Sequence, residues 1–182
     1  MSDQNIGKKM CEEENLLSFL EAYKEVFENY LTYSFGSSER PDFICYRTDG
    51  TEVGVELAKI MRDPRDAQAA YILDRIEFMD GEEAMEMLCV MIEEKERLRK
   101  QPDWALPDNT ILVLQFIDCS ISSLYLLDDG IKKGFESYGF AEIWIADYTG
   151  KAAYGDIEMF CLYPTELWGY YQRPNPGRKP YG

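Results

Sequence analysis

Two apolar runs of strand length restrict the fold most strongly. ILVLQFI occupies residues 111–117 and AEIWIAD occupies residues 141–147. A strand with one face in water alternates apolar and polar residues, whereas a continuous apolar run predicts a strand that is covered on both faces. Such strands are typical of proteins in which helices pack on both sides of one sheet. We therefore predict an α/β protein with a mixed central β-sheet flanked by helices.

The remaining elements follow from periodicity and from turn residues. Apolar residues at three- and four-residue spacing predict helices, and short apolar runs bounded by turn formers predict strands. The expected helices cover 12–34, 67–100 (in two pieces split near Asp80 and Gly81) and 129–138, and a further strand covers 155–163. The expected order is helix, hairpin, long helix, strand, short helix, strand, strand.

Length and composition predict one domain. The chain has 182 residues, of which 46% are hydrophobic, which is enough for a full core. We expect a single α/β domain over 1–168 and a basic tail, rich in Pro and Gly, over 169–182. The sequence has no apolar run long enough for a transmembrane helix and no signal-like apolar start. Five cysteines without a pattern are typical of reduced thiols, so we expect a cytoplasmic protein that does not associate with membranes.

The ionisable residues limit the catalytic chemistry and the partners that can be expected of this chain. The chain has no histidine, which excludes Ser-His and Cys-His nucleophile pairs and the common mixed zinc sites. A metal held by carboxylates, with Mg²⁺ or Mn²⁺ as the natural ion, is the hydrolytic chemistry left open. The net charge of −15 disfavours nucleic acid as a partner, because phosphate binding depends on Lys and Arg.

The segment RPDFICYRTDGTEVGVELAKI, residues 40–60, predicts a β-hairpin. A two-residue loop at Asp49 and Gly50 would mix polar and apolar residues on each face. A three-residue loop over 48–50 pairs Phe43 with Val55 and Cys45 with Val53, so that one face is wholly apolar. Because burial of one face sets register, we predict the three-residue loop, which places Asp42 opposite Glu56.

This register brings two acids together. Residues opposite each other in an antiparallel pair have β-carbons roughly 4.5–5.5 Å apart, and like charges there destabilise the pair. A divalent cation between Asp42 and Glu56 would remove the repulsion, and two carboxylates plus water commonly hold magnesium. Gly54, opposite Ile44, is expected to leave room beside them.

The hairpin resembles the PD-(D/E)xK nuclease superfamily. Pro41-Asp42 at a strand start is similar to the first element of that motif, and Glu56 in the next strand is similar to its second acid. The resemblance implies a restriction-endonuclease-like fold with an αβββαβ-type core. It also implies a metal-dependent phosphodiesterase that acts on nucleic acid, with Asp42 and Glu56 as catalytic and metal-binding residues. The sequence departs from the motif at Ala58, where the family usually has a lysine.

Two further residues are candidates for this site. Lys95 falls in the middle of the apolar stripe of EEAMEMLCVMIEEKERLRK, and a lysine facing the core needs a partner. The superfamily tolerates migration of its lysine to neighbouring elements, so the resemblance suggests Lys95 as the missing cation. The superfamily often adds a glutamate from its first helix, which makes Glu13, next to Glu12, a candidate metal ligand.

Structural interpretations of the same residues stay open. Asp42 follows a proline and suits a strand start, Lys95 suits a helix C-terminus, and Glu12 and Glu13 suit a first helical turn. Three functions are compatible with the sequence. The first is a metal-dependent nuclease. The second is an inactive nuclease-fold protein that serves as a binding or immunity-type partner, and the third is an unrelated α/β protein that binds a protein partner through its acidic surface.

Overall fold

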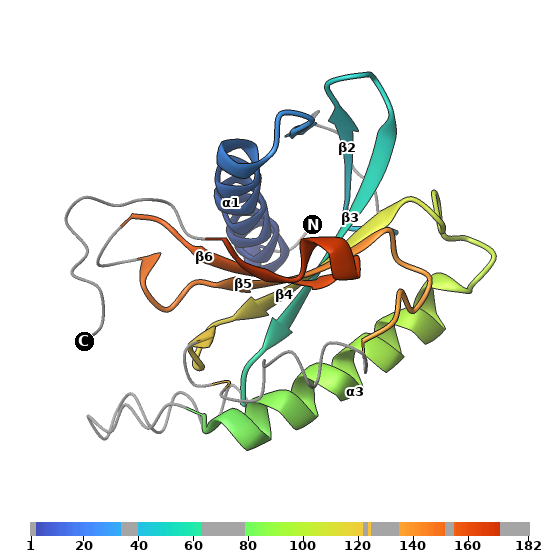
Figure 1. The fold of residues 1–182 in the computed structure, drawn as a ribbon. Coiled ribbons are helices and arrows are strands. Elements are labelled where there is room, and N and C mark those ends of the chain that lie inside the picture. The colour runs from blue at the N-terminus through green and yellow to red at the C-terminus, as the bar shows by residue number, and fades with distance from the viewer. Residues whose placement is uncertain are drawn as a thin grey trace.

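A computed structural model describes residues 3–33, 40–62, 79–121, 124, 135–151 and 155–171. These form an α/β protein in which a single sheet has one long helix on each side (Figure 1). The helices are α1 (Asp3–Val26), α3 (Gly81–Arg99) and the short 3-10 helix η3 (Thr165–Leu167). The strands are β1 (Leu31–Tyr33), β2 (Phe43–Arg47), β3 (Glu52–Ile60), β4 (Thr110–Phe116), β5 (Glu142–Asp147), β6 (Glu158–Tyr163) and β7 (Gly169–Tyr171).

The seven strands lie in the sheet in the order of the sequence. The first three form an antiparallel meander, β4 and β5 continue parallel to β3, and β6 and β7 are again antiparallel. A parallel neighbour needs a crossover connection, and the connection between β3 and β4 contains α3. The prediction of a mixed α/β sheet with flanking helices is confirmed.

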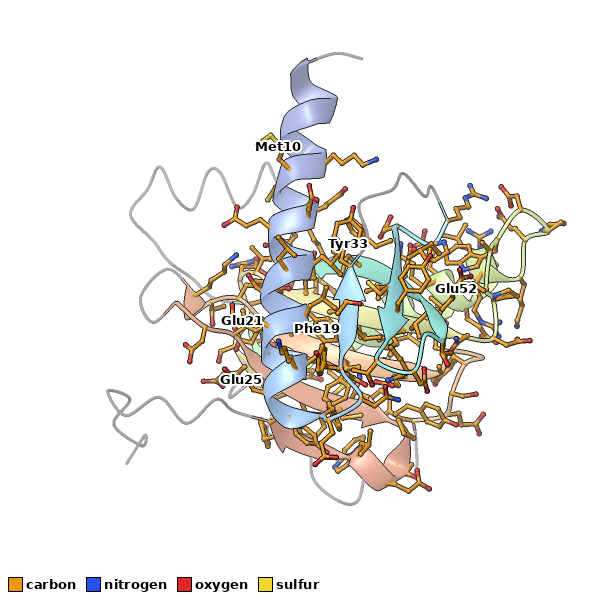
Figure 2. The ribbon with its side chains drawn as sticks, turned by 90° about the horizontal axis from the view of Figure 1, so that it is seen from above. Met10, Phe19, Glu21, Glu25, Tyr33 and Glu52 are labelled. Atoms are coloured by element: carbon orange, nitrogen blue, oxygen red, sulfur yellow. The ribbon has the colours of Figure 1, made fainter. Side chains whose placement is uncertain are left out.

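Each face of the sheet has its own hydrophobic core. Leu88 and Ile92 of α3 pack with Ala58 and Ile60 of β3 on one face. Phe19 of α1 packs in a second cluster on the other face, with alternate residues of the same strands. Figure 2 shows α1 lying across the strands, with its N-terminal part, near the exposed Met10, extending beyond them. None of the helices in the described ranges has the length and apolar character that crossing a bilayer requires.

The hairpin has the predicted register. Phe43 pairs with Val55 and Cys45 with Val53, and all four side chains are buried on the α1 side. The loop is the expected three residues, and its last residue, Gly50, has φ 85°, a left-handed conformation that glycine adopts without steric strain.

The first helix and first strand differ from the expectation of one helix over 12–34. The helix α1 begins earlier and ends at Val26, and residues 31–33 form the edge strand β1. Leu31 continues the helical apolar spacing, but it is buried opposite Arg47 of β2. Asn29 accepts hydrogen bonds from the backbone and the hydroxyl of Thr48. Pairing with β2, together with these bonds to the hairpin loop, favours a strand here over continued helix.

The other expectations are confirmed in part. The break near Asp80 is present, because Asp80 caps α3 by accepting the Glu83 backbone N–H at 2.9 Å. The preceding piece, 67–78, lies outside the described residues. Most of the expected helix 129–138 also lies outside them, and residues 135–138 are not helical. Residues 169–171, expected to begin the tail, form β7 on the edge of the sheet, and 172–182 lie outside the described residues.

Candidate functional site

The paired part of the hairpin ends at Phe43 and Val55. Continued for two residues, the same register would place Pro41 opposite Leu57, and proline has no N–H to donate to the Leu57 carbonyl. The Leu57 N–H donates to the side chain of Asp42, at Oδ2, at 2.9 Å. The carboxylate of Asp42 therefore takes the place of a backbone acceptor at the point where β2 ends and β3 continues.

Glu56 lies beside Asp42, as predicted. The backbone N–H of Asp42 donates to Glu56 Oε2 at 3.2 Å, so the two acids are linked through the chain as well as through their charges. Glu56 is 5% exposed. It alternates in β3 with residues of the α1-side core and shares the α3 side of the sheet with Ala58. Glu56 therefore points toward α3.

Lys95 completes the group from α3. Its Nζ lies 2.6 Å from Glu56 Oε1, and the two side chains are 18% and 7% exposed. Lys95 therefore faces the body, as its place on the apolar stripe predicted, and its ammonium contacts Glu56. Ala58, where the resemblance described above would place a lysine, is buried in the core under α3. The cation thus comes from the helix that covers this position.

The acid pair is electrostatically strained. Burial, and then the negative charge of Glu56, raise the pKa of Asp42 to about 6. The hydrogen bond from Leu57 and the charge of Lys95 lower this pKa, and the charge of Glu12 on α1 raises it further. Glu12 is thus the residue of the first helix whose charge acts on Asp42. A site with this excess of negative charge favours an additional cation.

Glu13, the predicted metal ligand from the first helix, is notable for one buried carboxylate oxygen. Its Oε1 is buried and has no hydrogen-bond partner among the described residues, which is costly for a carboxylate. Within the same described ranges, no three acid, cysteine or histidine side chains are grouped closely enough to hold a metal ion. Asp42 and Glu56 are the two predicted ligands that the structure brings together, and two carboxylates with water suit Mg²⁺.

Two other acids at strand ends have structural roles. Asp147 accepts hydrogen bonds from the backbone N–H groups of Ile121 and Thr149, both at 2.8 Å. Asp118 accepts two from Arg62, one from its backbone and one from its side chain. Asp147 thus joins the segments that follow β4 and β5, and Asp118 joins the segment after β4 to the segment after β3.

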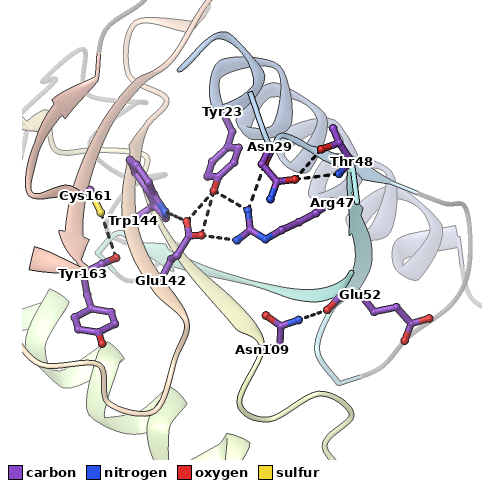
Figure 3. A network of polar contacts seen from close by, with 10 residues as sticks. All are labelled: Tyr23, Asn29, Arg47, Thr48, Glu52, Asn109, Glu142, Trp144, Cys161 and Tyr163. Carbon is purple, nitrogen blue, oxygen red and sulfur yellow. Dashed lines mark hydrogen bonds and ion pairs between the residues drawn. The ribbon is translucent and has the colours of Figure 1, made fainter. Parts of the chain in front are cut away.

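A second buried polar group was not predicted (Figure 3). Glu142, at the start of β5, accepts hydrogen bonds from Arg47 Nη2 at 2.6 Å, from Trp144 Nε1 at 2.7 Å and from the Tyr23 hydroxyl at 3.1 Å. Arg47 also donates to the Tyr23 hydroxyl and to the carbonyl of Asn29. Burial, and then the charge of Glu142, raise the pKa of Tyr23. The donors and acceptors satisfy one another, so this network joins α1, the hairpin and β5.

Comparisons of the chain with family models, with curated proteins and with solved structures find no significant match.

Proposed function

We propose that the protein is a metal-dependent phosphodiesterase of the nuclease type that acts on nucleic acid. The observation that carries the proposal is the meeting of Asp42, Glu56 and Lys95 at one point, where β2 leaves β3. Asp42 directly precedes β2, Glu56 lies in β3 and Lys95 lies on α3, and each is positioned by a hydrogen bond or an ion pair. A buried acid pair with an adjacent lysine is the arrangement that the PD-(D/E)xK resemblance implies.

The order of elements supports the same proposal. A helix, three antiparallel strands, a helix and a strand parallel to the third follow one another along the chain. This order is similar to the αβββαβ core of the restriction-endonuclease-like fold. In the family the first acid stands at a strand start and the second in the next strand, and here Asp42 directly precedes β2 and Glu56 lies in β3.

The roles of the residues follow from their positions. Asp42 and Glu56 would hold Mg²⁺ or Mn²⁺, which when bound supplies Lewis acidity toward a phosphodiester and lowers the pKa of water. Lys95 is within reach of Glu56 and presents an ammonium group, which would stabilise negative charge that develops on the phosphate oxygens. The backbone N–H of Asp42 and the ammonium of Lys95 orient the two oxygens of Glu56.

The test is cleavage of labelled single- and double-stranded DNA and RNA with Mg²⁺, with Mn²⁺ or with EDTA. Wild type, Asp42→Asn, Lys95→Ala and Lys100→Ala are purified in parallel. Lys100 is the C-cap of the same helix but is 60% exposed and pairs with Glu96, so Lys100→Ala is the matched control. We expect metal-dependent cleavage by wild type and Lys100→Ala and its loss in the other two. Cleavage that persists in Asp42→Asn would contradict the proposal.

A second candidate is favoured by charge. The net charge is −15, and the basic side chain of Arg40, two residues before Asp42, has an acceptor within the protein. Arg40 pairs with Asp103 at 3.0 Å. Such a surface suits an inactive nuclease-fold protein that binds a basic partner protein. Folded wild type that cleaves none of the four substrates with either metal would favour this alternative.

A further inference from the structure

Asp42 lies just outside the paired part of β2, so its position depends on the residues before it. Pro41 is buried directly against Gly54 of β3. A β-carbon built on Gly54 would lie 2.5 Å from Cγ of Pro41 and 2.8 Å from Oγ1 of Thr110. Both distances are shorter than real contacts of a β-carbon. The space that we expected to stay open at Gly54 is therefore filled by the Pro41 ring.

The loop that follows α3 forms hydrogen bonds with Arg40, which directly precedes Pro41. The backbone N–H of Ala105 donates to the carbonyl of Arg40 at 3.2 Å, and the Arg40 side chain binds Asp103 and Gln101. The Thr110 hydroxyl, which lies against Gly54, donates to the carbonyl of Leu106 at 2.7 Å. The helix that carries Lys95 thus continues into a loop that fixes the residues immediately before Asp42.

We propose that Gly54 is a positioning residue for Asp42. By leaving room for Pro41 against the backbone of β3, Gly54 allows the Asp42 carboxylate to reach the Leu57 N–H and the Asp42 N–H to reach Glu56. The loop 101–106 clamps this segment from the other side. The consequence for metal binding rests on the proposed function, whereas the positioning itself does not.

The sign of the stability change in Gly54→Ala distinguishes this positioning role from the usual effect of a glycine in a strand. Glycine inside a strand is unfavourable, and alanine in its place stabilises the strand when the methyl group fits. The clash with Pro41 predicts the opposite, because the methyl group must displace the proline ring. Since Asp42 follows Pro41 directly, this displacement breaks the hydrogen bond between Leu57 and Asp42.

The direct test is amide hydrogen exchange by NMR on metal-free wild type and Gly54→Ala. The Leu57 N–H reports on Asp42, and the Val55 N–H, in the paired part of the same strand, corrects for global stability. We expect the ratio of exchange rates of Leu57 to Val55 to rise about tenfold in Gly54→Ala, as for a local opening. Gly155→Ala is the control, since Gly155 has φ 77° with nothing within 4 Å of its β-carbon position, so the substitution strains the backbone away from the site. An unchanged ratio in Gly54→Ala would overturn the proposal.

Two further measurements complete the experiment. If Gly54→Ala does not fold, Arg40→Ala removes the side-chain bonds of the outer clamp, to Asp103 and Gln101, at a side chain that is 40% exposed, and an unchanged exchange ratio there overturns the proposal. Calorimetric titration with Mn²⁺ then tests the consequence, with an expected loss in affinity of about tenfold in Gly54→Ala and none in Gly155→Ala. A wild type that binds no Mn²⁺ would refute the proposed function, whereas the exchange ratio decides the positioning role separately.

Discussion

The ammonium of Lys95 and the carboxylate of Glu56 lie 2.6 Å apart, although 39 residues separate them along the chain. One residue lies on α3 and the other on β3, so the pair joins a helix to the sheet that it covers. Both side chains are largely removed from water. Removal of one partner from such a pair leaves the other as an uncompensated buried charge.

The first prediction follows from this pairing. Lys95→Ala should lower the free energy of unfolding by about 2–4 kcal/mol, because Glu56 loses its cation while it stays buried. Urea unfolding followed by circular dichroism measures the change. Lys100→Ala, in the exposed pair with Glu96, should cost less than about 1 kcal/mol. Equal losses in the two variants would mean that the pair with Glu56 behaves as a surface contact.

The second prediction concerns metal. Millimolar Mg²⁺ or Mn²⁺ should raise the melting temperature of the wild type, because an ion that binds only the native state stabilises it by mass action. Asp42→Asn should abolish this shift, since one of the two carboxylates loses its charge. Differential scanning fluorimetry with and without EDTA measures it, and Ca²⁺-free buffer avoids a competing ion. The same shift in wild type and Asp42→Asn would place the ion elsewhere.

The third prediction concerns pH. The pKa of Asp42 is raised to about 6 from 3.8, so between these pH values the folded protein binds more protons at Asp42 than the unfolded chain does. The free energy of unfolding should therefore fall as pH rises from about 4 to about 6 and then level off, by roughly 1–3 kcal/mol from this group. In metal-free buffer the Asp42→Asn variant should not show this fall in the free energy of unfolding, and it should be more stable than the wild type at pH 7.5.

The comparison at low pH provides the control for this prediction. At pH 4 the carboxyl of Asp42 is protonated in the folded protein, so wild type and Asp42→Asn should have nearly the same stability. A stability difference between the two proteins that does not change between pH 4 and 7.5 would contradict the raised pKa.

The fourth prediction concerns the network around Glu142. Glu142→Gln keeps the shape of the side chain but removes the charge that pairs with Arg47 at 2.6 Å. Loss of charge from a buried, hydrogen-bonded partner should lower the free energy of unfolding by about 2–4 kcal/mol. Glu14→Gln, at a side chain that is 73% exposed and 3.4 Å from Lys151, should change it by less than about 1 kcal/mol. Similar small changes in both would show that the network adds little to stability.

The residues of the site could be predicted from the sequence where the pattern of apolar residues in one segment allowed a single arrangement. The alternation of Phe43 and Cys45 with Val53 and Val55 allowed one register with a clean apolar face, and the acid pair followed from it. Lys95 was recognisable because a charged residue lay on an otherwise apolar helical stripe. Both signals come from short segments, in which the period of the element decides which side chains share a face.

The features that the sequence did not reveal depend on distant contacts. Glu142 begins a strand, where an acid is also common at the surface, and its partners Tyr23 and Arg47 are 119 and 95 residues away. The three-residue strand β1 is too short for periodicity to identify. The role of Gly54 depends on Pro41 and Thr110 together, and no spacing rule relates the three. These relationships arise only when the elements pack.

The hairpin segment provides the two acids, and α3 provides the cation. This division has a consequence for biosynthesis. The hairpin precedes α3 in the sequence, so during synthesis the two acids leave the ribosome before their lysine does. The ammonium of Lys95 reaches Glu56 only when α3 packs on the face of the sheet that β3 and β4 form together. The group of two acids and a lysine is therefore completed only in the folded domain, and a chain that ends before α3 has the acids without their cation.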